Sequence, residues 1–203
     1  MDRESLSFIN ALVASGPAPD RADKMMLYGQ FIGAWDGTVT RYGANGERFD
    51  ASAEVHFGWA LEGRAIQDVW IVPSRVGRAP GEPDKMNGTT LRIYDPRHDN
   101  WQITFIDPVR QTHDRMSGQQ VGADIVQEYR DANGTIGQWC FTEIETNSFH
   151  WISRTSNDER TTWRLTGEYY LKRRQPQDAR AEPDLQRTRA QTAELSSLRA
   201  IRT

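Results

Sequence analysis

The chain has 203 residues, 10% of them aromatic, and a formal net charge of −3. This length suits one domain with appendages, and seven Trp, seven Phe and six Tyr can build a sizeable core, which excludes disorder across the whole chain. The acidic balance with dispersed positive charges argues against binding to nucleic acid or an anionic membrane, and the single cysteine, Cys140, excludes a disulfide framework.

The N-terminal segment, residues 1–32, is predicted to be helical. Residues 3–14 place Leu6, Ile9 and Leu12 on one helical face, and a second short helix is expected to end at Gly33. The first residues carry charges in place of an apolar leader, and no run approaches the roughly 18 apolar residues of a spanning helix. We therefore expect a cytoplasmic protein with no membrane partner.

From residue 33 to residue 173 the pattern of residue types differs from that of the N-terminal segment and predicts an all-β domain. Short runs rich in aromatic and β-branched residues alternate with turn signals, and nearly all connectors are short enough to force antiparallel neighbours. A meander of this length exposes two edges unless it closes, so we predict a closed antiparallel up-and-down barrel of about 8–10 strands. Residues 174–203 read as a polar tail, helical or flexible. The expected strands are 35–42, 49–61, 64–73, 87–95, 100–107, 110–117, 122–130, 135–145, 148–156 and 161–172.

A sequence motif at the start of the barrel resembles the G-x-W signature of the calycin (lipocalin-like) superfamily. Gly33-Ala34-Trp35 follows a short helix and opens the first strand. The resemblance implies that Trp35 packs across the closed end of the barrel against a basic residue of the last strand, here Lys172 or Arg173. Three longer segments resemble bacterial calycin-like domains of the uncharacterised DUF1579-like family: HFGWALEGRAIQDVW at 56–70, GTTLRIYDP at 88–96 and FTEIETNSFHWISRTSNDERTTW at 141–163.

The hairpin turns predict which side chains share the inner face, because residues opposite each other on paired strands point the same way. Apolar walls with a few convergent polar groups are the composition of a ligand pocket. The predicted walls include Phe57, Trp59, Trp70, Trp139 and Phe141, and the polar groups among them are Arg64, Asp68, Asp114, Glu128, Glu143, His150 and Arg154.

Glu143 and His150 are the favoured pair for chemistry, with Asp68 nearby. A carboxylate opposite an imidazole can orient it for proton transfer without a cofactor. Two alternatives stay open: His150 can be a strand histidine with one structural hydrogen bond, and the inward charges can pair with one another. Neither a metal site nor a nucleotide site has the required spacing in this sequence.

The sequence therefore predicts a barrel that binds a polar or cationic organic molecule and, as an enzyme, acts as a cofactor-free isomerase, cyclase or lyase. The alternatives are a non-catalytic carrier or sensor, a purely structural or protein-binding barrel, and a haem barrel similar to nitrobindin with His150 as axial ligand. The chain keeps Gly37 of that opening motif but has Val39 at the next glycine position. A homodimer is compatible with the sequence.

Overall fold

The computed structural model describes residues 3–175, so the predicted tail lies almost wholly outside the described residues. The chain divides into two compact units, Met1–Arg173 and Arg174–Thr203, and the helices and strands described here belong to the first. They are helices α1 (Arg3–Leu12) and α2 (Ala22–Gly29), the 3-10 turn η1 (Pro19–Arg21), and strands β1 (Val13–Ala14), β2 (Gly33–Tyr42), β3 (Arg48–Ala60), β4 (Ala65–Val72), β5 (Met86–Asp95), β6 (Asn100–Asp107), β7 (Thr112–Val121), β8 (Asp124–Arg130), β9 (Ile136–Glu145), β10 (Ser148–Ser156) and β11 (Arg164–Arg173).

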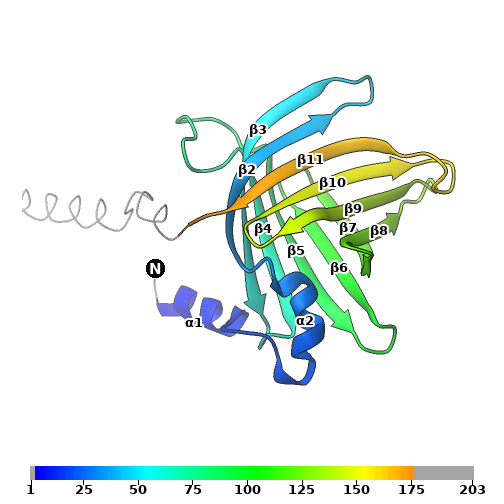
Figure 1. Ribbon diagram of the computed structural model, residues 1–203. Coiled ribbons are helices and arrows are strands. Elements are labelled where there is room, and N and C mark those ends of the chain that lie inside the picture. Colours follow the sequence, from blue (N-terminus) through cyan, green and yellow to red (C-terminus); the bar gives the residue numbers. More distant parts are fainter. Residues whose placement is uncertain (1–2, 176–203) are drawn as a thin grey trace, which may run out of the picture. The chain divides into compact units, whose positions relative to one another are not determined.

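Strands β2 to β11 form a closed antiparallel barrel (Figure 1). Each strand pairs with the next one along the chain, and β11 pairs with β2, which closes the circle. The predicted up-and-down barrel is confirmed, and closure leaves neither end strand of the meander with an open edge. The short strand β1 adds to β3 through Val13 opposite Ala60.

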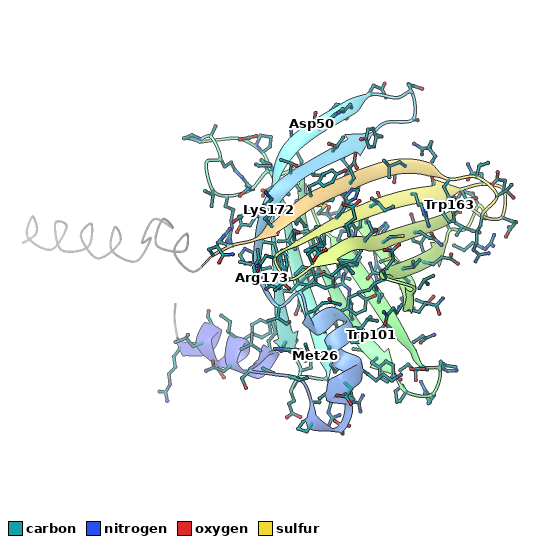
Figure 2. The ribbon with its side chains drawn as sticks, viewed as in Figure 1. Met26, Asp50, Trp101, Trp163, Lys172 and Arg173 are labelled. Atoms are coloured by element: carbon teal, nitrogen blue, oxygen red, sulfur yellow. The ribbon has the colours of Figure 1, made fainter. Side chains whose placement is uncertain are left out.

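Helix α2 lies at one end of the barrel and closes it. Tyr28 and Phe31 are buried there, and the Phe31 ring lies 4.7 Å from that of Phe141. Trp35 Nε1 donates a 2.7 Å hydrogen bond to the Phe31 carbonyl oxygen, and the Arg173 guanidinium lies 4.1 Å from the Trp35 ring. Figure 2 shows Arg173 at the end of β11 on this side of the barrel. Of the two basic residues expected to cover Trp35, the structure selects Arg173.

Two hairpins have the faces that their turns predict. Across β3 and β4, Phe57 lies opposite Asp68 and Trp59 opposite Ile66. Across β6 and β7 the loop is longer than a two-residue turn, so Phe105 pairs with Asp114 in place of Thr112. This shift by two residues keeps the same side chains on the inner face, because strand side chains alternate with period two.

Two further hairpins differ from the prediction by one residue, which exchanges the faces. Glu128 lies opposite Gln138, so the odd-numbered residues of β8 point inward. Between β9 and β10 a bulge interrupts the pairing after Ser148, and Glu143 there has a φ of 50°. Trp151 consequently lies opposite Phe141, and His150 and Arg154 lie on the outer face. The extra residue of a bulge is what a turn-based register does not anticipate.

Helix α1 is less buried than its apolar stripe predicts. None of its residues is buried, and the exposed fraction of Leu6 is 47%. Within residues 3–175, no helix combines the length and the apolar character needed to span a bilayer.

Candidate functional site

The candidate site is a cavity of about 180 Å³ inside the barrel, at the end opposite α2. Its position follows from its lining: Arg41 ends β2, Met86 begins β5, and Arg110 lies in the loop between β6 and β7. A second space of about 410 Å³ shares Arg41, Met86, Arg110 and Tyr169 with the cavity and adds Lys85 and Asp50. We call this second space the mouth.

Aromatic side chains form the wall of the cavity. The ring of Trp151 lies 5.5 Å from both Trp70 and Trp139, and Phe105 lies 5.0 Å from Trp139. Most of these contacts are edge-to-face or tilted, the arrangements that aromatic pairs prefer. The wall is therefore apolar, and it consists of rings whose positions are fixed by one another.

A buried ion pair lies at the inner end of the cavity. Arg92 lines the cavity with only 1% exposure, and it donates to the carboxylate of Asp68, which is 0% exposed. Asp68 also accepts a 2.8 Å hydrogen bond from the backbone N–H of Thr90, and Arg92 Nε donates to Gln127 Oε1 at 2.9 Å. These bonds compensate both charges for the loss of water.

Two arginines lie where the cavity meets the mouth. Arg41 Nη2 donates a 3.0 Å hydrogen bond to the Tyr169 hydroxyl, and its guanidinium lies 5.4 Å from that ring. Arg110 is paired with the fully buried carboxylate of Asp107. The Met86 sulfur accepts a hydrogen bond from each arginine, at 3.7 Å from Arg41 Nη2 and 3.3 Å from Arg110 Nη2.

Two polar groups on β7 complete the lining. Burial raises the pKa of the Asp114 carboxyl, an effect that Arg110 and His113 only partly oppose. The Thr112 hydroxyl is buried and has no hydrogen-bond partner within the described part of the chain. Tyr129 also lines the cavity, and burial followed by the charge of Asp114 raises its pKa.

Several predicted residues lie inside the barrel. Trp70, Trp139 and Asp114 line the cavity. Asp68 holds Arg92, as described above, and Phe57 and Phe141 belong to the aromatic core beneath it, against Phe31. Trp59 is half-buried and packs against α2, where a Cβ atom at Gly29 would lie 2.4 Å from its ring.

The predicted acid–base pair is outside the barrel, which corrects the expectation that it lies in the pocket. His150 Nε2 lies 3.1 Å from Glu168, its Nδ1 lies 3.7 Å from Glu143, and its ring stacks on Tyr170 at 4.1 Å. Burial tends to raise the pKa of Glu168, but hydrogen bonds from Tyr42, Tyr170 and His150 lower it overall. The cause of the misplacement is the bulge at Glu143.

Three other predicted lining residues also lie outside the cavity. Glu128 is paired with Arg160, and Arg154 donates to Gln138 and lies 4.6 Å from the Trp163 ring. Arg64 lies in the turn between β3 and β4, where it pairs with Asp20. Glu128 and Arg154 lie outside because of the one-residue shifts. Arg64 lies outside because the turn has four residues in place of the expected two.

Sequence reasoning missed Arg41, Arg92 and Trp151. Strands β2 and β5 meet the next strand through loops of several residues, 43–47 and 96–99, and loops of this length specify a register less tightly than a two-residue turn. A usable signal did exist for Arg41: it is an even number of residues from Trp35, so period-two alternation puts both on one face. Trp151 was assigned to the outer face because the bulge was not foreseen.

Within the part of the chain that the structure describes, no group of three or more His, Cys, Asp or Glu side chains can hold a metal ion. None of the four histidines of the sequence lines the cavity.

Comparison with known proteins shows the fold. No protein-family model matches the sequence, and no curated protein matches it. Rv2717c from M. tuberculosis is similar in structure, with a TM-score of 0.54 and 12% identity over 78% of this chain and 99% of that one. The S-type phycobiliprotein lyase CPES from Guillardia theta has a TM-score of 0.49 and 9% identity, over 78% and 98%. The protein EF1p2_mFAP2b, solved bound to DFHBI, has 0.38 and 13%, over 74% and 99%. The likeness to Rv2717c is one of fold alone, and the fold of this chain is the closed antiparallel barrel described above.

Proposed function

We propose that this barrel binds a small organic molecule in the cavity opposite α2, as a carrier or sensor, and that it is a member of the DUF1579-like calycin domains. The observation that supports the function is the cavity itself. Its walls are aromatic, and a few polar groups converge on it, among them Arg41, Thr90 and Asp114. Such a combination of apolar walls and few polar groups is typical of small-molecule sites.

The size and shape of the cavity limit the ligand. Its volume of about 180 Å³ lies below the roughly 300 Å³ at which pockets for drug-sized molecules begin. A volume of this size admits a body of one or two fused rings lying against Trp70, Trp139 and Trp151, and a longer substituent would extend into the mouth. Flat apolar bodies gain edge and face contacts with such rings.

The geometry supports binding better than the acid–base enzyme or the haem barrel. His150 and Glu143 lie on the outer face, so the predicted proton-transfer pair does not reach a ligand in the cavity. For the same reason His150 cannot act as an axial ligand from within. Asp114 is the carboxyl that lines the cavity among the described residues, and an enzymatic version of the proposal would depend on it.

Binding can be tested with 2-naphthamide, a neutral molecule with two fused rings. Isothermal titration calorimetry should detect binding, and the tryptophan fluorescence should change because three indoles line the cavity. Ser153 lies on the inner face with 4% exposure, so Ser153→Phe should fill the cavity and abolish binding. Ser117→Phe, on the exposed face of β7, is the matched control. Binding that survives Ser153→Phe would contradict the proposal, and so would wild-type protein that binds neither 2-naphthamide nor its charged analogues.

A further inference from the structure

The positive charges inside the barrel are not all balanced by carboxylates. Arg92 is paired with Asp68, and Arg110 with Asp107, and both of these carboxylates are fully buried. Arg41 differs, because its partners among the described residues are the Tyr169 hydroxyl, the Tyr169 ring and the Met86 sulfur. A guanidinium on the inner wall that has only neutral partners attracts an anion.

The surroundings of Arg41 leave room for such an anion. Gly167 lies opposite Arg41 on β11, and a Cβ atom there would come within 2.9 Å of Arg41 Cδ. The absence of a side chain at Gly167 therefore lets Arg41 lie along the wall, against Tyr169. Arg41 lines both the cavity and the mouth, so a group bound to it would lie at the junction of the two.

The carboxylates near this junction do not take the place of the anion. Asp50 lines the mouth but is bound by Arg48 and by the Thr40 hydroxyl. Asp114 lines the cavity, but it forms no ion pair within 4.0 Å among the described residues. Burial also favours the neutral form of Asp114, which reduces its contribution to the charge balance.

Further donors point to the same end of the cavity. The buried Thr112 hydroxyl has no partner among the described residues, and it follows Arg110 by two positions. Lys85 lines the mouth. A hydroxyl in the cavity, an ammonium in the mouth and two guanidinium groups shared by both spaces provide hydrogen-bond donors to an acid group.

From these observations we propose that the ligand carries an anionic group, of the carboxylate or sulfonate class, and that Arg41 binds this group at the junction of cavity and mouth. The inference rests on the proposed function, since it concerns the charge of the molecule held between the tryptophans. It reverses the polar or cationic ligand that the sequence predicts. The apolar body would lie inside, and the acid group would face the open end.

Matched ligands separate this inference from the proposed function. The probes are 2-naphthoate, 2-naphthamide and 2-(aminomethyl)naphthalene, which share the ring system and differ in charge. We expect 2-naphthoate to bind about tenfold or more tightly than 2-naphthamide, a factor that one charge-assisted interaction at a partly buried site supplies. Binding of the cationic probe should be the weakest.

Variants of two residues should act in opposite directions. Arg41→Gln should remove the preference for 2-naphthoate while 2-naphthamide still binds, and Arg41→Lys should retain part of it. Asp114→Asn removes the carboxyl that lines the cavity among the described residues and should strengthen the binding of 2-naphthoate. Raising the salt concentration should weaken the binding of 2-naphthoate and leave that of 2-naphthamide unchanged.

Equal affinity for 2-naphthoate and 2-naphthamide in wild-type protein would overturn the inference and leave the proposed function intact. Tightest binding of the cationic probe would overturn it in favour of the ligand that the sequence predicts. Failure of all three probes would contradict the proposed function itself. If Arg41→Gln binds neither naphthalene derivative, the fold is damaged, and Arg41→Lys, Asp114→Asn and the salt dependence then decide.

Discussion

Replacing Asp68 by Asn tests whether the ion pair at the inner end of the cavity is as dry as the structure indicates. Asn fits the same space and can still accept the hydrogen bond from Thr90 N–H. It removes the negative charge beside Arg92, whose side chain is 1% exposed. The guanidinium would then be buried next to an amide that cannot neutralise it.

The expected cost follows from this burial. Removing one partner of a buried ion pair destabilises proteins by about 3–5 kcal/mol, because the remaining charge has neither water nor a counter-ion. For a chain of this length, each kcal/mol lowers the melting temperature by about 2–4 °C, so the expected fall is about 6–20 °C. Replacing both residues, as Asp68→Asn with Arg92→Met, should recover a large part of the loss.

Urea unfolding followed by tryptophan fluorescence, together with thermal unfolding, measures both quantities. Glu159→Gln is the matched control, because the Arg130–Glu159 pair has side-chain exposures of 45% and 70% and should contribute less than about 1 kcal/mol. If Asp68→Asn costs no more than Glu159→Gln, water reaches the pair, and the barrel interior is wetter than we argue.

Three shorter predictions concern the outer wall and the closed end. Burial alone would raise the pKa of Glu54, but hydrogen bonds from Arg75 and His56 lower it to about 2, from 4.5. Because the pKa is lowered in the folded state, the Glu54 carboxylate stabilises the fold above pH 4.5 and loses this contribution as the pH falls towards 2. Urea unfolding should therefore show that Glu54→Gln loses less stability than the wild-type protein between pH 4.5 and 2. Glu143→Gly should be neutral or stabilising by up to about 1 kcal/mol in thermal unfolding, because Glu143 has a φ of 50°; clear destabilisation would show that its contact with His150 matters more. Arg173→Leu should cost about 2 kcal/mol in urea unfolding, since Arg173 covers Trp35 and donates to the carbonyls of Gln30, Ile32 and Thr146; an unchanged midpoint would show that Trp35 alone holds the closed end.

The barrel and its closed end could be predicted because their signals are local. Turn residues at short intervals force antiparallel neighbours, and the only long-range pairing needed is that of β2 with β11. Trp35 follows a short helix, and a basic residue at the end of the last strand meets it in the closed barrel. The inner face of β3 was also predicted, because the short turn between β3 and β4 sets which residues of the two strands lie opposite each other.

The cavity could not be predicted to the same degree, because faces in a barrel depend on single residues. One extra residue in β9 moves His150 and Arg154 out and moves Trp151 and Ser153 in. Bulges have no strong sequence signature when the residue in the left-handed region is Glu and not Gly. A hairpin turn therefore predicts a register only as far as the first bulge.

The same effect reversed the expected charge of the ligand. Two of the carboxylates counted as inward, Glu128 and Glu143, belong to hairpins whose faces were exchanged. Arg41 and Arg92 lie on β2 and β5, whose loops to the next strand are longer than a two-residue turn and specify the register less tightly, so neither cation was counted. The shifts in these two hairpins take Glu128 and Glu143, and also Arg154, out of the interior. The proposed anion site depends in addition on Arg41, which lies on β2 and is not moved by those shifts. The charge of a barrel interior is thus a property of the register of every strand, and a comparison of 2-naphthoate with 2-(aminomethyl)naphthalene tests the inward placement of Arg41 on β2 as directly as it tests the ligand.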